Sequence, residues 1–462
     1  MSIIVVSSGV SSSGVDLPPF HLMFVEDGGT ASATQVRGAE TVSSGGATGG
    51  DTVSSGGVQT VLAGGSASDV SVLSGASEWL FAGSHDSGVT VSSGGSLVLA
   101  GLVVPSHADL VFAQPTAAAS SIWGATLDVG ARIHLAVAIV HGGGTLTLDA
   151  GVDALGATVS AGASLVGGGD LHVTLLDEGL VSGVRLSLIA ADVKSGGVIE
   201  GDAFEGGAAV AVGAGGHADG VVVGSGAAAV VSGGDIVSSF VHAHGAVGLL
   251  SGGEATRTVV SGGLIDIQRG GEADGTVLRG GGAQRVGQGG LASATLVSSG
   301  GRETLAGGDS DGGVVFKGGA EVVDAGTDAG LTLGSGAVLD WNSFSAKLTD
   351  LTLAPGAELF VRVTSARAVI SGSTLTIEND HGHVVGSATL ANTDFSLVAT
   401  PKSGGVTEFL VAATPSPAAS AGAPAALLTQ AMAAHGATAA SPLLSTPHSA
   451  TTSSLAQVLS PR

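Results

Sequence analysis

The sequence predicts an all-β solenoid, in which coils of about 19 residues stack on one another through parallel strands. Diglycine pairs recur at a nearly fixed period, and short segments of high strand propensity lie between them. The pairs ending at Gly46, Gly57 and Gly65 are separated by eleven and eight residues, and a similar alternation returns between Gly253 and Gly319. Adjacent steps sum to about 18 or 19 residues, which gives the length of one coil.

Each repeat has the composition of a strand followed by a bend. Segments such as Thr-Val-Leu at 276–278 and Leu-Ile-Asp-Ile at 264–267 combine β-propensity with partial alternation of apolar and polar residues. Glycine pairs permit positive φ or close backbone approach at the bends. One coil buries too few apolar side chains to be stable alone, so the coils are expected to stack.

The overall composition narrows the class of protein. The chain has 462 residues, of which 80 are glycine, and its mean hydropathy is +0.50 with 11% charged residues, which argues against a disordered acidic chain. A net charge of −23 opposes binding to nucleic acid or to anionic membranes. Cysteine is absent, so disulfides and thiolate metal sites are excluded.

The pattern divides the chain into four segments. We expect an N-terminal cap at the Pro18-Pro19 break, a repetitive solenoid with a degenerate stretch, bulkier C-terminal coils with a cap, and a flexible Ala/Ser/Pro-rich tail. The predicted ranges are 1–27, 28–337 (degenerate at 101–192), 338–413 and 414–462, with a short helix from Ala425 to His435.

The first residues lack the features of a secretory signal. The first basic residue is Arg37, and the apolar run from Ile3 to Val6 is too short for a signal-peptide core. No Sec signal peptide is therefore recognised. If the protein is exported, either its route does not use such a peptide or the sequence does not include it. Glycine and serine also interrupt every apolar run well before about 20 residues, so no transmembrane helix is expected.

The repeat unit resembles a known family. Units of the form Ser-Gly-Gly-x-x-x-Val-x-x-Gly, as in 55–64, and Ser-Gly-Gly-Leu-Ile-Asp-Ile-Gln-Arg-Gly, at 261–270, are similar to the passenger repeats of AIDA-type autotransporter adhesins. The resemblance covers roughly residues 28–337. It implies a right-handed parallel β-helix outside a Gram-negative cell, with roles in adhesion, autoaggregation or biofilm formation.

The resemblance also implies a modification. Some members of the family are O-glycosylated by a heptosyltransferase on repeat hydroxyls, and the matching serines here each precede a diglycine. They are Ser44, Ser55, Ser93, Ser232, Ser251, Ser261 and Ser299. The alternative is a purely structural role, because short polar residues favour turns.

This sequence departs from the family at its C-terminal end. It contains no translocator barrel with alternating strands and a terminal aromatic residue, and it ends in Val458-Leu-Ser-Pro-Arg462. We therefore expect separate export machinery as a partner. The remaining partners expected are host or bacterial surface molecules, or further copies of the chain, and no nucleic acid.

The sequence gives little support for a metal site. Asp309-Ser310-Asp311 does not repeat at the nine-residue spacing of calcium-binding solenoids. The pairs His242/His244 and His381/His383 have a His-x-His spacing but no visible third ligand, which favours solvated histidines near turns. No metal site and no cofactor are predicted.

An enzymatic function has no clear starting point either. Glycoside hydrolysis needs paired carboxylates in a cleft, whereas Glu272, Asp274, Glu303 and Glu321 are expected at outward, solvated positions. No catalytic residues are predicted. The function expected is that of an extracellular or cell-surface adhesin-like passenger acting through an extended repetitive face. The alternative is a structural stalk or matrix spacer, and the third choice is a β-helix carbohydrate-active enzyme.

Overall fold

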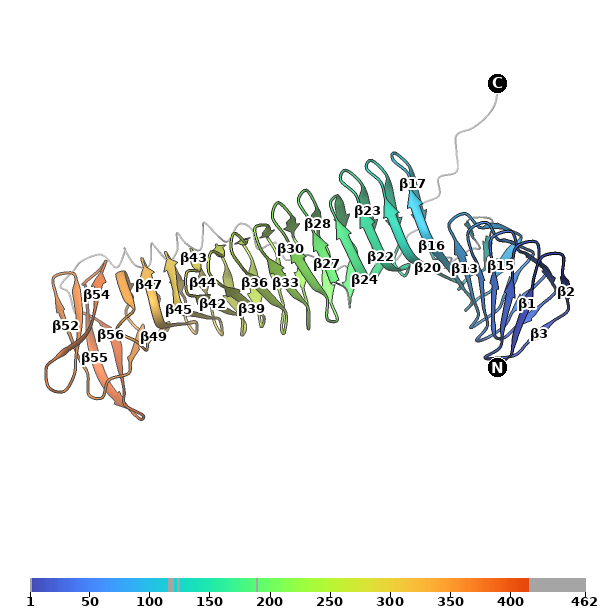
Figure 1. The fold of residues 1–462 in the computed structure, drawn as a ribbon. Helices are drawn as coiled ribbons and strands as arrows, with labels where there is room; N and C mark the ends of the chain where they lie inside the picture. Colours follow the sequence, from blue (N-terminus) through green and yellow to red (C-terminus); the bar gives the residue numbers. More distant parts are fainter. Residues whose placement is uncertain (1, 115–119, 123–124, 188–189, 415–462) are drawn as a thin grey trace, which may run out of the picture. The chain divides into compact units, whose positions relative to one another are not determined.

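The computed structural model describes residues 2–114, 120–122, 125–187 and 190–414, and the helix expected at 425–435 lies outside these ranges. The described residues form strands and turns without a helix. Consecutive coils pair through parallel strands, so the protein is a parallel β-helix as predicted (Figure 1). Among the described residues, no helix has the length and apolar character needed to cross a bilayer.

Each of the first coils has three strands, and these strands belong to three separate sheets. The first sheet contains β1 (Ile3–Val6), β4 (Leu22–Val25), β7 (Ala39–Val42), β10 (Val58–Val61), β13 (Ser77–Phe81) and β16 (Ser96–Val104). The second contains β2 (Ser11–Ser13), β5 (Thr30–Ser32), β8 (Ala47–Gly49), β11 (Ser66–Ser68) and β14 (His85–Ser87). The third contains β3 (Asp16–Leu17), β6 (Gln35–Val36), β9 (Thr52–Val53), β12 (Ser71–Val72), β15 (Val89–Val91), β19 (Ala125–Leu127) and the antiparallel β18 (Ser120–Ile122).

The strands of the later coils all join one large sheet. One ladder continues from β16 through β20 (Arg132–Val140), β22 (Asp153–Val159), β24 (Asp170–Asp177), β27 (Ala190–Val193), β30 (Ala209–Val212), β33 (Ala228–Val231), β36 (Ala246–Leu249), β39 (Leu264–Ile267), β42 (Ala283–Gly287), β45 (Arg302–Asp311), β47 (Ala320–Ala329), β49 (Val338–Trp341) and β51 (Glu358–Val361). A second contains β17 (Asp109–Phe112), β21 (Thr145–Leu148), β23 (Ser164–Gly167), β25 (Leu180–Ser182), β28 (Val198–Glu200), β31 (His217–Asp219), β34 (Asp235–Val237), β37 (Glu254–Thr256), β40 (Glu272–Asp274), β43 (Leu291–Ser293), the second halves of β45 and β47, and β50 (Lys347–Leu353). The third contains β26 (Arg185–Ser187), β29 (Ala203–Glu205), β32 (Val222–Val223), β35 (Phe240–Val241), β38 (Val259–Ser261), β41 (Val277–Arg279), β44 (Leu296–Val297), β46 (Val314–Val315) and β48 (Thr332–Leu333). The long strands β20, β22, β24, β45 and β47 each contribute to two ladders.

A change of register separates the two groups of coils. Strand β15 pairs with β19, so that Val89 lies opposite Ala125, and β16 pairs with β20 with two register shifts. The second sheet ends at β14 and the third at β18, and only the first sheet continues into the later coils. We call the coils before this junction the first stack and those after it the second stack.

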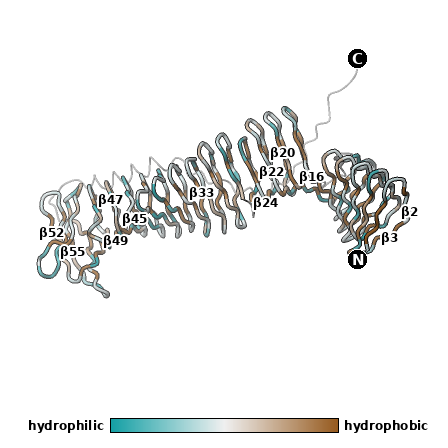
Figure 2. Tube along the Cα trace, in the orientation of Figure 1, coloured by the Kyte–Doolittle hydropathy of each residue, from teal (hydrophilic) through white to brown (hydrophobic). Residues whose placement is uncertain are grey.

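The core consists of columns of inward side chains. Val42, Val61, Leu80 and Leu99 occupy equivalent positions in successive coils and are all buried. Each such side chain contributes about 1.5–3 kcal/mol through burial. Figure 2 shows the resulting mixture of hydrophobic and hydrophilic positions along the chain.

The structure differs from the expectation of an irregular N-terminal segment. Residues 3–17 already form three strands in register with the next coil, and Ile3 lies opposite Leu22. The Pro18-Pro19 break falls at a corner between β3 and β4, where no ladder hydrogen bond is lost.

Antiparallel strands cover the C-terminal end of the second stack. They are β52 (Arg367–Ser371), β53 (Thr374–Glu378), β54 (Val384–Leu390), β55 (Phe395–Lys402) and β56 (Val406–Ala413). Strand β56 pairs antiparallel with β51, the last strand of its ladder. The hairpin of β55 and β56 thereby covers the edge of β51, which would otherwise be free to pair with another chain. Trp341 is buried beneath this region, 4.9 Å from Phe344 between ring centroids.

Candidate functional site

The seven candidate serines lie at corners between strands. Ser44, Ser55, Ser93, Ser251 and Ser299 occupy turns, Ser232 a bend, and Ser261 the last position of β38. Six of the seven are exposed, and Ser261 is partly buried. The glycine that follows each of the seven has a positive φ, for example 76° at Gly45 and 82° at Gly56, so the corner geometry selects glycine there.

The serine side chains fill space left by glycines of the next coil. A Cβ atom placed on Gly64 would lie 2.5 Å from Ser44 Oγ, and one on Gly75 would lie 2.7 Å from Ser55 Oγ. Backbone hydrogen bonds also connect these corners, as from Gly56 N to Gly75 O at 2.8 Å. The Ser-Gly pattern therefore supports stacking. The serine hydroxyl of one coil lies so close to the glycine of the next coil that a side chain at that glycine would collide with it.

Stacking brings some candidate serines together and leaves others apart. Ser55 and Ser93 belong to one corner column, with Ser74 in the coil between them, and Ser232 and Ser251 occupy adjacent coils of another. Ser74 is exposed and has the same environment, since a Cβ on Gly94 would lie 2.6 Å from its Oγ. The search for diglycines missed Ser74 because Gly75-Ala76 follows it, although the coil period would have identified it.

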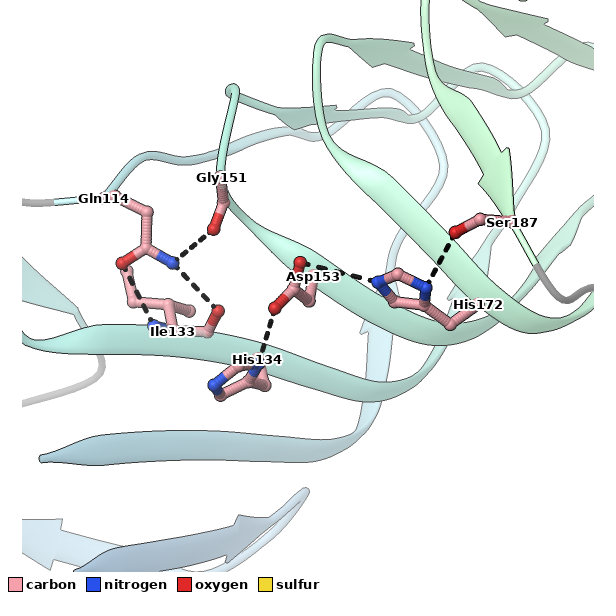
Figure 3. A network of polar contacts seen from close by, with 7 residues as sticks. All are labelled: Gln114, Ile133, His134, Gly151, Asp153, His172 and Ser187. Carbon is pink, nitrogen blue, oxygen red and sulfur yellow. Dashed lines mark hydrogen bonds and ion pairs between the residues drawn. The ribbon is translucent and has the colours of Figure 1, made fainter. Parts of the chain in front are cut away.

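A second group of polar residues lies on the outer side of the first coils after the junction. His134, Asp153 and Asp170 are neighbours in the register of β20, β22 and β24. Asp153 is central in this group, because its Oδ2 lies 3.2 Å from His134 Nδ1 and its Oδ1 lies 3.5 Å from His172 Nε2 (Figure 3). Ser187 on β26 forms a hydrogen bond of 2.9 Å with His172 Nδ1.

These side chains are partly shielded from water. Burial lowers the pKa of His134, and the nearby Asp153 opposes part of that shift. Asp153, Asp170 and His172 each offer a ligand atom, and these atoms lie within 4.8 Å of one another. A neighbouring surface cavity of about 460 Å³ is lined by Gln114, Val129, Gly130, Ala131, Arg132, His134, Gly151 and Asp153. Gln114 holds one side of it through a hydrogen bond of 2.7 Å to Gly151 O.

The histidine and aspartate pairs considered from sequence lie elsewhere. His242 and His244 are exposed at a turn, and His381 is exposed between β53 and β54, where it contacts Asp380 at 2.6 Å. Asp309 and Asp311 belong to strand β45, and Ser310 between them is buried. These residues therefore do not form a calcium-type loop.

The expectation of outward carboxylates was wrong for two residues. Glu272 and Asp274 are exposed on β40, but Glu303 and Glu321 are completely buried. Alternation along the strand explains this, because Glu303 shares its side of β45 with the buried Leu305, and Glu321 shares its side of β47 with Val323.

The buried acids belong to two inner polar columns. In the first stack Gln59 Nε2 donates to Glu40 Oε2 and Asp51 Oδ2, both at 2.9 Å, and Glu78 follows in the next coil. In the second stack Gln284, Glu303 and Glu321 are successive in register, and Gln284 Nε2 donates to Glu303 Oε1 at 3.0 Å. We call these the first and second inner columns.

Burial suppresses ionisation in both columns. Desolvation, with a smaller effect from Asp51, raises the pKa of Glu40 to about 8. Desolvation and then Asp328 raise the pKa of Glu303 to about 7, and the same causes raise that of Glu321 well above its usual value. Burial therefore favours the protonated form of these acids.

Comparisons with known proteins find solved structures that superpose only poorly on this chain as a whole. No protein-family model and no curated protein matches the chain. The TibC-catalysed hyper-glycosylated fragment of TibA is 25% identical, with a TM-score of 0.23, and the match covers 77% of this chain and 93% of that one. The Dettilon tailspike protein is 13% identical with a TM-score of 0.17, over 77% of this chain and 69% of that one. A tailspike protein mutant of E. coli bacteriophage HK620, in complex with a pentasaccharide, is 11% identical with a TM-score of 0.16, over 89% and 84%. Because all three scores are low, the fold assignment rests on the strand register itself.

Proposed function

We propose that the chain is an adhesin-like passenger protein of the cell surface or extracellular space, and that it makes contacts along a repetitive face. The observation that supports this is the recurrence of exposed Ser-Gly corners in successive coils, as at Ser55, Ser74 and Ser93. The repeat resembles that of AIDA-type passengers over roughly residues 28–337. A face built from equivalent positions suits multivalent contacts, whose total strength grows with the number of coils engaged.

The proposal includes O-glycosylation of the corner serines by a heptosyltransferase. The hydroxyls of Ser44, Ser55, Ser93, Ser232, Ser251 and Ser299 are on exposed residues, which a modifying enzyme can reach without unfolding the core. Ser261 is less exposed and should be modified least. Ser74 joins the candidates because it has the same corner environment.

Intact-mass measurement of the chain from its native host tests the modification. We expect a mass above that of the bare sequence, by increments of one hexose or heptose unit. Replacement of Ser55, Ser74 and Ser93 by alanine should remove up to three increments. The matched control replaces Ser11 and Ser13, which are exposed in strand β2 and not at a corner, and should remove none. A mass equal to the bare sequence would refute glycosylation.

Beads coated with the full chain test the adhesin function separately. We expect the beads to aggregate or to adhere to cells, and adhesion to decline gradually as whole coils are deleted. A chain that acts only as a stalk would leave the beads dispersed under every condition. Sudden loss of adhesion on removal of one particular coil would instead indicate a single localised site.

A further inference from the structure

We propose that Asp153, Asp170 and His172 form a binding site for one divalent transition-metal ion, Zn²⁺ in particular, on the outer side of β22 and β24. The residues offer two carboxylate oxygens and one imidazole nitrogen, a donor set that suits zinc. Three protein ligands leave a fourth position for water. The site is independent of the serine corners, so its failure would leave the proposed adhesin function unaffected.

The separation of the ligand atoms carries the proposal. His172 Nε2 lies 3.5 Å from Asp153 Oδ1, longer than the roughly 2.7–2.9 Å of a charge-assisted hydrogen bond. Two ligands bonded to zinc at about 2.0–2.1 Å with tetrahedral angles are about 3.3 Å apart, which is close to the observed distance. The pair His217 and Asp235 makes the contrast, since its atoms are 2.6 Å apart and leave no space for an ion.

The surroundings of the three residues orient them as metal ligands. Ser187, which is not a ligand, occupies Nδ1 of His172 and so leaves Nε2 directed at Asp153 (Figure 3). His134 contacts the second oxygen of Asp153 at 3.2 Å. Such outer contacts fix the rotamer and tautomer of metal ligands.

Asp170 supplies a further indication. Its Oδ1 atom is inaccessible to solvent and has no hydrogen-bond partner among the described residues. The nearest cation is Arg185, whose Nε lies 3.7 Å away, and which also lies 3.7 Å from Glu205. The Arg185 side chain is 57% exposed, so it can turn toward Glu205 when an ion binds Asp170.

Bound metal would connect two successive coils. Asp153 belongs to β22, whereas Asp170 and His172 belong to β24, and register alone places them together. This part of the chain has few diglycine corners, so a metal cross-link would fasten coils whose turn stacking is reduced. An ion that binds only the folded chain should raise thermal stability, by an amount that grows with the logarithm of its concentration above the dissociation constant.

Calorimetric titration with ZnCl₂ tests the site, using the full chain without an affinity tag after treatment with a chelator. We expect saturable binding of one equivalent and a rise in the unfolding temperature. Asp170→Asn and His172→Gln keep the side-chain shapes and should each weaken binding at least tenfold. The matched control, His217→Gln, alters the His–Asp pair that is already closed and should leave binding unchanged.

Circular dichroism of each variant before titration establishes that its strands are intact. Saturable binding that disappears only in the Asp170 and His172 variants supports the site. Two results would overturn the site. One is absence of saturable binding to the parent chain, and the other is an affinity in Asp170→Asn and His172→Gln equal to that of the parent chain. Loss of binding in the His217 variant alone would also overturn it, because the ion would then be bound elsewhere.

Discussion

An inner and an outer column of polar side chains are both aligned by the strand register, but the inner column is buried and the outer one is in contact with water. In the second inner column, Gln284, Glu303 and Glu321 occupy successive coils and are almost completely buried. On the outer side of β20 to β24, His134, Asp153 and Asp170 also occupy successive positions, but they retain access to water. The inner acids have raised pKa values because desolvation disfavours their charged form.

The difference teaches that register brings groups together and burial decides what they can bind. A carboxyl group in the apolar core is most stable with its proton. An outer carboxylate stays in contact with water, and the proposed metal ion would replace a neighbouring cation there. The first two of the next three experiments alter the second inner column, and the third alters corners of the first stack.

The largest effect is expected when a carboxyl group is introduced on the inward side of a strand rather than on its outward side. Ile265 precedes Gln284 in the inner column and is fully buried, whereas its neighbour Leu264 is 39% exposed. Ile265→Glu should reduce the free energy of unfolding at pH 8 by on the order of 3 kcal/mol, because it adds an unpaired buried acid. Leu264→Glu should change it by less than about 0.5 kcal/mol. Urea unfolding followed by circular dichroism measures both, and equal losses would contradict the inward and outward assignment.

A smaller, opposite effect is expected from removing an inner acid. Glu321 faces Glu303 from β45 and Asp328 from its own strand, and its folded pKa lies well above the ordinary 4.5. Between pH 4.5 and the folded pKa the native chain holds more protons than the unfolded chain, so stability falls as pH rises through that window. Glu321→Gln removes the titration and should stabilise the chain at pH 8, by up to about 1.4 kcal/mol for each pH unit of the window.

Thermal unfolding at pH 4.5 and pH 8 checks this prediction. The two chains should be nearly equal in stability at the lower pH and should separate at the higher one. Glu272→Gln, on the exposed side of β40, is the matched control and should have no such dependence. A variant less stable than the parent at pH 8 would show that ionised Glu321 is favourable in the core.

A third effect is expected at the corners between strands of the first stack. Gly64 and Gly56 have φ values of 79° and 82°, but a Cβ on Gly64 would meet Ser44 Oγ at 2.5 Å, and one on Gly56 would meet nothing within 4 Å. Gly56→Ala should therefore cost about 1–2 kcal/mol for backbone strain alone. Gly64→Ala should cost about 1 kcal/mol more, and Ser44→Gly should recover that difference in urea unfolding.

Much of the fold follows from the period of the glycine pairs, because positive φ is needed wherever a coil turns. The inward acids were missed, although their positions obey a simple rule. Glu303 is the second residue after Gly301 and points inward, whereas Glu272 is the first after Gly271 and points outward. In these strands the first residue after the diglycine points outward and the second points inward. Composition alone does not reveal this alternation.

The outer His–Asp group was harder to predict because its members come from different coils. Asp153 follows His134 by 19 residues, but Asp170 follows Asp153 by 17, so a constant period does not align all three. Local spacing instead directed attention to His242 and His244, which lie at an exposed turn. Grouping of side chains across coils requires the actual register.

The register shifts within the β16–β20 pair mark the junction between the two stacks. The ladder of β13 and β16 continues into the short first half of β20, while the second half of β16 begins the ladder of four-residue strands beyond it. The inward column that reaches Leu99 in the first stack therefore continues through Leu135 and Ala154 in the second, and all three side chains are buried. The junction changes the length of the strands that carry this column without interrupting its burial.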